Sequence, residues 1–143
     1  MVLRHREDAK ITRLRTIELF KHADKKALQH LASAADEITF APGAELLRQG
    51  HRHTDGFVIM AGAVTVVLDG EVVAEIPEGE MVGELALFGH AAATATVVAK
   101  TEVDALSIPY NRFDQILDDN PTLTKAIAQQ LAGRLAAMDK RHA

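Results

Sequence analysis

Turn signals divide the middle of the chain into short segments, and their spacing limits the fold more than any other feature of the sequence. From Glu37 to Ile108, apolar residues alternate with polar ones, which is typical of strands. Proline and glycine turns interrupt the alternation at 42–43, 50, 62, 69–70 and 77–79. The segments between these turns predict strands at 38–40, 45–49, 57–60, 63–68, 72–76, 94–99 and 103–108. Short strands separated by regular turns favour a mainly β fold, most simply a jelly roll.

Helical spacing flanks this β region on both sides. It predicts a first helix over 6–19 and a second one capped by Asp24. After the strands it predicts a helix over 111–117 and a final helix with Pro121 in its first turn. The apolar side of the final helix carries Leu123, Ile127, Leu131, Leu135 and Met138. We therefore expect one domain over 1–143, with a helical segment at 6–33, a β-roll at 37–108 and C-terminal helices at 111–140.

Charge distribution and missing residue types exclude several classes of protein. The chain has no cysteine, so disulfide-stabilised folds are excluded. Its net charge of −4 combines +4 over residues 1–30, −9 over 31–110 and +1 over 111–143, so the strand region is a poor surface for nucleic acid. The longest apolar run, twelve residues from Phe57 to Leu68, is too short to span a bilayer, and residues 1–8 lack the apolar core typical of a signal peptide. We expect a cytoplasmic protein without membrane or nucleic-acid partners.

One stretch, from Gly83 to Thr96, carries residue types that suit an anion. A glycine comes first, then the acidic Glu84, one predicted helical turn, a loop and a strand. Glycine lets the backbone approach a ligand closely, and the first N–H groups of a helix have no partner within the helix. Such N–H groups receive an anion without any side chain. The stretch therefore predicts a phosphate site.

This stretch resembles the phosphate-binding cassette of the cyclic nucleotide-binding domain family, which includes the catabolite activator protein, regulatory subunits of cAMP-dependent kinase and cyclic-nucleotide-gated channels. The surrounding framework is also similar: Phe40-Ala41-Pro42-Gly43, Gly50, Phe57-Val58-Ile59, Gly62-Ala63-Val64, Ile76 and Gly79. The resemblance covers roughly residues 12–140. It implies an eight-stranded β-roll with N-terminal helices and two C-terminal helices, a non-enzymatic signalling role, and cAMP or cGMP as the ligand.

The resemblance also implies roles for individual cassette residues. Glu84 would accept a hydrogen bond from the ribose 2′-hydroxyl. Gly83, Leu85 and Ala86 would offer backbone groups near the sugar and the phosphate. Thr94 would donate a hydroxyl to the phosphate, and His90 would donate to it from the loop. The predicted ligand-binding residues are therefore Gly83, Glu84, Leu85, Ala86, His90, Ala93 and Thr94.

Ala93 is where the sequence departs from the family. The family's cassette has an arginine at this position, and between Arg52 and Arg112 the only lysine or arginine here is Lys100. A guanidinium meets a phosphate with two parallel charge-assisted hydrogen bonds that no other side chain reproduces. We therefore expect a sensor or regulatory domain whose binding of cAMP and cGMP is weak or lost.

Two other functions remain open on the sequence alone. The same fold without a ligand would serve as a protein-interaction module, with the final helix binding a partner protein or a second copy of the chain. A cupin-type metalloenzyme would place His51 and His53 on alternate strand positions as metal ligands. A cupin would have a further histidine ligand at the position that Val82 occupies here, so this ligand is missing. No nucleophile–base pair indicates catalysis.

Overall fold

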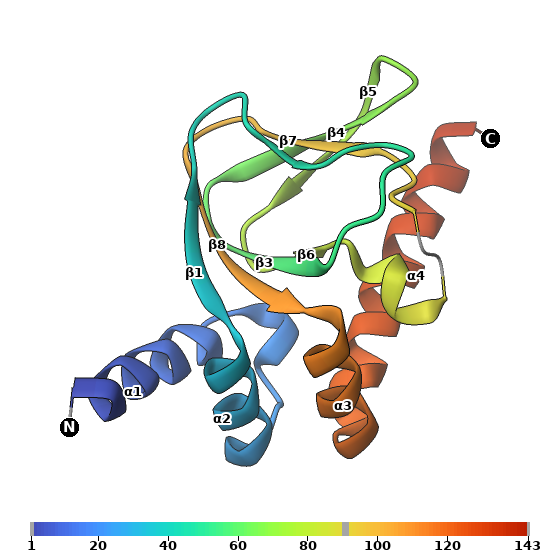
Figure 1. Cartoon of the computed structure of the whole chain (residues 1–143). Coiled ribbons are helices and arrows are strands. Elements are labelled where there is room, and N and C mark those ends of the chain that lie inside the picture. The colour runs from blue at the N-terminus through green and yellow to red at the C-terminus, as the bar shows by residue number, and fades with distance from the viewer. Residues whose placement is uncertain (1, 90–91, 143) are drawn as a thin grey trace.

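Two four-stranded antiparallel sheets face each other in the computed structural model, which describes residues 2–89 and 92–142 (Figure 1). The strands are β1 (Asp36–Phe40), β2 (Glu45–Leu47), β3 (Asp55–Ala61), β4 (Ala63–Leu68), β5 (Glu71–Pro77), β6 (Met81–Val82), β7 (Thr96–Ala99) and β8 (Val103–Pro109). Their order is β1-β8-β3-β6 in one sheet and β2-β7-β4-β5 in the other. Neighbouring strands thus alternate between early and late parts of the chain, as in a jelly roll. The predicted fold class is confirmed.

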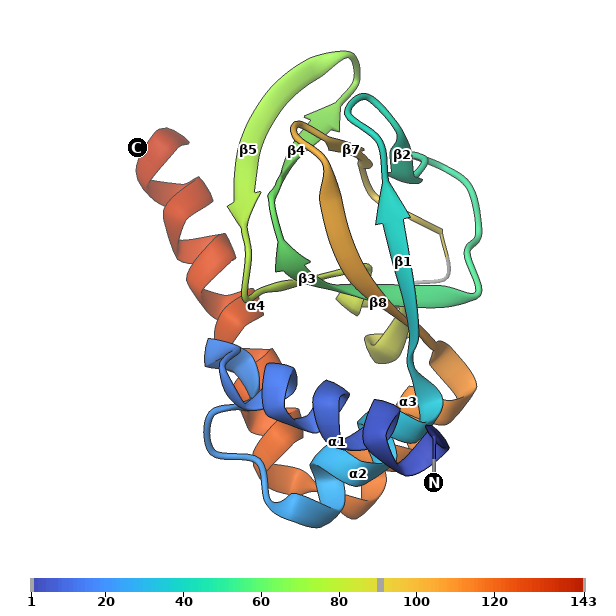
Figure 2. The ribbon, with the colours of Figure 1, turned by 90° about the vertical axis from the view of Figure 1, so that its left-hand side faces the viewer.

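Most of the helical structure lies at one end of the roll, where it covers the outer face of the first sheet, and the last helix continues from there alongside the roll (Figure 2). These helical elements are α1 (Val2–Arg15), the 3₁₀ turn η1 (Glu18–Phe20), α2 (Lys25–Ala34), α3 (Tyr110–Asp119) and α4 (Pro121–His142). The predicted cap of α2 is confirmed, because Asp24 Oδ1 accepts the backbone N–H of Ala27 at 2.8 Å. Within the described ranges, no helix has the length and apolar character that a bilayer crossing requires.

β3, in the middle of the first sheet, is buried on both faces, which explains its continuous apolar run. Phe57 and Ile59 point between the two sheets, where they pack with Val64, Ile76 and Val97 of the second sheet. Val58, between them in sequence, points the other way into the helices. Because successive side chains of a strand alternate in direction, a strand between two cores needs apolar residues at every position. This sheet carries β6, the strand that leads into the cassette, at its edge.

Several predicted boundaries are wrong, and each has a local cause. The first helix ends at Arg15 rather than at residue 19, because Ile17 is extended and lets Phe20 turn into the core, where it is fully buried. The strand expected over 45–49 ends at Leu47, because Gln49 turns away to bond Thr96 and Asp69. The strand expected from residue 94 starts at Thr96, and β6 was not predicted at all.

Candidate functional site

A cavity of about 500 Å³ lies between the β-roll and α4. Six of the predicted ligand-binding residues line it: Gly83, Glu84, Leu85, Ala86, Ala93 and Thr94. The seventh, His90, lies outside the described residues. The structure therefore brings together residues from both ends of the cassette, and their roles toward a ligand stay predictions.

The cassette opens at Gly83 with a backbone conformation that favours glycine. Its φ is 83° and its ψ is 14°, in the left-handed region. A Cβ at this position would lie 2.7 Å from the hydroxyl oxygen of Tyr110, so the close approach also requires glycine. The predicted helical turn is the five-residue 3₁₀ segment η2 (Glu84–Phe88), which ends at Gly89. Both ends of η2 are thus set by glycines with positive φ.

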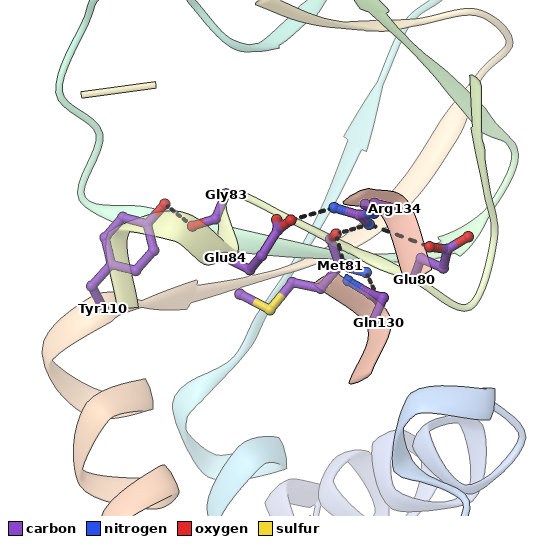
Figure 3. A network of polar contacts seen from close by, with 7 residues as sticks. All are labelled: Glu80, Met81, Gly83, Glu84, Tyr110, Gln130 and Arg134. Atoms are coloured by element: carbon purple, nitrogen blue, oxygen red, sulfur yellow. Dashed lines mark hydrogen bonds and ion pairs between the residues drawn. The ribbon is translucent and has the colours of Figure 1, made fainter. Parts of the chain in front are cut away.

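Glu84 is buried, with 5% of its surface exposed, and its charge is compensated by the final helix. Nη1 of Arg134 in α4 donates to Oε1 of Glu84 at 2.5 Å (Figure 3). Burying a carboxylate is costly unless an opposite charge and hydrogen bonds accompany it. The carboxylate that the family resemblance assigns to a ribose hydroxyl therefore has an internal partner in this structure.

Arg134 and Gln130 together hold the strand edge in front of the cassette. Nη2 of Arg134 donates to the backbone oxygen of Met81 and reaches Oε1 of Glu80 at 3.4 Å. Gln130 Oε1 accepts the backbone N–H of Met81 at 3.1 Å, and Gln130 Nε2 donates to the backbone oxygen of Met81 at 3.3 Å. Since β6 is an edge strand, the Gln130 amide takes the place of a neighbouring strand. Among the described residues, Nε of Arg134 is a buried donor without a hydrogen-bond partner.

Tyr110 closes the other side of the cassette. Its hydroxyl donates to the backbone oxygen of Gly83 at 2.8 Å, and it lines the cavity. Burial raises the pKa of the Tyr110 phenol to about 12, and the negative charges of Glu84 and Asp55 add to the effect. Tyr110 is therefore a neutral hydrogen-bond donor that ties the first residue of α3 to the first residue of the cassette.

Ala93 and Thr94 line the cavity from the last part of the cassette. The backbone N–H of Ala93 donates to His51 at 2.9 Å, and its oxygen accepts from Gly50 at 2.8 Å. These bonds fix the end of the cassette to the loop between β2 and β3. Neither residue carries a charge. Among the described residues that line the cavity, Arg134 is the only lysine or arginine.

The two histidines that suggested a cupin have a structural explanation in part. Nε2 of His53 accepts the backbone N–H of Arg48 at 3.0 Å, which stabilises the loop after β2. The described part of the chain contains no group of three His, Cys, Asp or Glu side chains placed to hold a metal ion. The cupin arrangement therefore has no counterpart among these residues.

Sequence reasoning missed Arg134, Gln130 and Tyr110 as site residues. Gln130 and Arg134 follow Ile127 at intervals of three and four, which puts them on the buried side of α4. The sequence did contain a signal for them, because these two polar residues interrupt an otherwise apolar face of the predicted helix. Their partners, Met81 and Glu84, are about 50 positions away, so the signal could not show what they bind.

Comparisons with known proteins identify the family of the chain. Residues 37–120, more than half of the chain, match the family of the cyclic nucleotide-binding domain. The potassium/sodium hyperpolarization-activated cyclic nucleotide-gated channel 4 of Homo sapiens is 24% identical over 127 residues, which cover 89% of this chain and 11% of the channel. The chain thus corresponds to a small part of that channel.

Two solved structures of regulatory subunits are similar in fold. One is a triple mutant of the regulatory subunit of a cAMP-independent protein kinase A from Trypanosoma brucei, bound to cAMP in its A site. It has a TM-score of 0.77 and 25% identity, and the match covers 92% of this chain and 53% of that one. The other, cAMP-bound PfPKA-R, has a TM-score of 0.84 and 15% identity over 99% of this chain and 49% of that one. The matched family is that of a binding domain rather than of an enzyme, and the chain belongs to this family, the cyclic nucleotide-binding domain family.

Proposed function

We propose that this domain is a regulatory ligand sensor in which the binding of cAMP and cGMP is weak or lost. The charge of the cavity carries this proposal. Glu75, Glu80 and Glu84 line it, and Arg134 already pairs with two of these carboxylates. In the described part of the chain, a cyclic phosphate entering the cavity finds no arginine or lysine that is free to receive it.

Ala93 accounts for the missing charge. It lines the cavity at the position where the family's cassette has an arginine. Removing one partner of a buried charge pair costs about 2–5 kcal/mol. This corresponds to roughly 30-fold to several-thousand-fold in affinity. A loss of this size changes a strong ligand into a weak one.

One of the similar structures supports the importance of an arginine. The Trypanosoma brucei kinase is described as cAMP-independent, and the form bound to cAMP is a mutant in which one of the three substitutions replaces a threonine by an arginine. In that protein, a gained arginine accompanies bound cAMP. We propose the same dependence here, with Ala93 as the position that lacks the arginine.

Calorimetric titration with cAMP and with cGMP tests the proposal on three proteins. The wild type should bind both weakly, and Ala93→Arg should bind at least about tenfold more tightly, which is about 1.4 kcal/mol. Val72→Arg is the matched control, because Val72 is 70% exposed and does not line the cavity. It adds the same charge elsewhere, so it should leave the affinity unchanged.

Further outcomes separate the role of the added arginine charge from the role of the other cassette residues. The gain from Ala93→Arg should shrink when Glu84→Ala is added, because both residues would hold one ligand. Tight binding by the wild type would show that the arginine is not needed. A folded Ala93→Arg protein that gains nothing would favour the interaction module over the sensor.

The interaction module is the second candidate, and the exposure of α4 is the observation that favours it. Leu123 and Ile127 are used in the core of the domain itself, so two of the five residues of the apolar stripe have an internal partner. Further along α4, Leu135 is 57% exposed. We propose that this exposed part of α4 pairs with a second copy of the chain or with a partner protein.

A further inference from the structure

We propose that the cavity takes an uncharged small molecule with an apolar body and a single hydroxyl or N–H group at one end. This inference rests on the proposed function, because it names the class of ligand that a cavity without a free cation accepts. Three independent features support the inference: the apolar side chains of the cavity wall, the exposed apolar side chains at the cavity, and the charge of the cavity.

Apolar side chains form most of the cavity wall. Strands of both sheets and α4 contribute Leu47, Val66, Leu68, Val73, Ile76, Val82, Val97, Leu131 and Leu135. Ligand cavities of several hundred Å³ lined mainly by apolar groups, with a few polar groups at one place, are typical of small-molecule sites. At about 500 Å³, this cavity has the right size for a molecule of two or three rings.

The cavity also collects apolar side chains that are left exposed. Among the described residues, four large apolar side chains are exposed: Ile38, Leu68, Val72 and Leu135. Leu68, at the end of β4, and Leu135, in α4, both line the cavity. Exposed apolar surface that lines a hollow marks a place where a ligand or partner is bound. An apolar ligand between β4 and α4 would cover both side chains.

The charges disfavour an anion, and the Glu84 carboxylate offers an acceptor. Of the three carboxylates that line the cavity, Glu75 pairs with Lys100, and Glu80 and Glu84 hold the guanidinium of Arg134. Among the described residues, the bond of the Glu84 side chain runs through Oε1 to Arg134, so Oε2 remains as an acceptor. A neutral donor such as a hydroxyl or an N–H group suits it, whereas a sulfonate or phosphate is repelled.

Two fluorescent probes with the same ring system test this selection. N-phenyl-1-naphthylamine is uncharged and has one N–H group, and 1-anilinonaphthalene-8-sulfonate adds a sulfonate to the same rings. We expect the uncharged probe to bind the wild-type chain at least about tenfold more tightly than the sulfonate. Ala93→Arg should shift this preference toward the sulfonate, because it adds a positive charge to the cavity wall.

A matched pair of variants on one strand locates the bound probe. Ala74 lines the cavity from β5, so Ala74→Phe should fill it and reduce binding of N-phenyl-1-naphthylamine at least about tenfold. Val72→Phe adds the same side chain two residues earlier on β5, outside the cavity lining, and should bind the probe as the wild type does. Circular dichroism and thermal unfolding confirm that both variants fold.

Failure of this inference differs from failure of the proposed function. The inference is overturned if the uncharged probe does not bind, if the sulfonate binds as tightly, or if Ala74→Phe folds and binds the probe as the wild type does. Tight binding of cAMP by the wild type would overturn the proposed weak binding instead. Probe binding lost in Ala74→Phe and kept in Val72→Phe, with the expected preference for the uncharged probe, supports the inference whatever cAMP does.

Discussion

Two separate constraints require a glycine at position 83 of the candidate site. Its φ of 83° costs little for glycine and strains any other residue, and its Cα faces the Tyr110 hydroxyl so closely that a Cβ would lie 2.7 Å from it. Gly70, in the hairpin between β4 and β5, also has a φ of 83°, but a Cβ there would meet nothing within 4 Å. Comparing substitutions at the two glycines therefore separates the cost of backbone strain from the cost of the steric contact.

We expect Gly83→Ala to lower the free energy of unfolding by more than Gly70→Ala. The backbone cost of about 1–3 kcal/mol is common to both, and the contact with Tyr110 is added only at Gly83. Urea unfolding of both variants measures the difference. In a Tyr110→Phe background the extra cost at Gly83 should become smaller, because the clashing oxygen is gone. Equal losses in the two variants would show that the contact relaxes freely.

Tyr110 offers a second test at this scale, because it is the only tyrosine and the chain has no tryptophan. Its pKa of about 12 in the folded state lies above the ordinary value of 10.0. The folded state thus holds the phenolic proton more tightly than the unfolded state. The resulting stability is fully present below pH 10 and is lost as the pH rises toward 12.

The tyrosinate absorption of the whole protein should therefore titrate with a midpoint near 12 when folded and near 10 in denaturant. Glu84→Gln should lower the folded midpoint, because the negative charge of Glu84 contributes to the shift. Circular dichroism recorded along the titration gives the pH range over which the protein is folded. A midpoint near 10 in the folded range would mean that the phenol is open to water.

At the scale of elements, α4 joins the end of the chain to the start of the cassette. Its first half packs in the helical core through Leu123 and Ile127. Its later part is attached to the roll by Gln130 and Arg134, which bond Met81, Glu80 and Glu84 (Figure 3). The later part of α4 therefore depends on a few polar contacts with β6, Glu80 and η2, and three of the residues that make them, Glu80, Glu84 and Arg134, line the candidate site.

Arg134→Met should lower the free energy of unfolding by about 2–4 kcal/mol, because it leaves the buried Glu84 carboxylate without its partner. Urea unfolding measures this loss, and hydrogen exchange should show reduced protection in α4 after Gln130. Adding Glu84→Gln should restore part of the stability, since the unpaired charge is removed. If the double variant is as unstable as Arg134→Met, packing of the arginine rather than its charge is responsible.

At the scale of the whole molecule, the exposed part of α4 tests whether the chain pairs with itself. Light scattering at micromolar concentration should give twice the mass of the chain if Leu135 and its neighbours form an interface. Leu135→Glu places a charge in that interface and should return the mass to that of one chain. Ile38→Glu is the control, because Ile38 is exposed on β1 and does not belong to α4. A wild-type monomer would remove the dimer hypothesis.

The sequence by itself determined those features whose signals lie within a few residues. The apolar run of β3, the Asp69-Gly70 turn and the Asp24 cap all act locally, so their elements were predicted with errors of a few residues. The glycine framework and the cassette were sufficient to identify the family, and the sequence alone shows the alanine at position 93.

Tertiary structure alone decided which side chains meet at the site. Arg134 and Glu84 are 50 positions apart, and Tyr110 and Gly83 are 27 apart, so their contacts depend on how α3 and α4 dock on the roll. The end of the first helix at Arg15 was likewise set by the burial of Phe20, which outweighed local helical spacing. Periodicity indicates which face of an element is buried, but the partner of a buried polar group is chosen by packing.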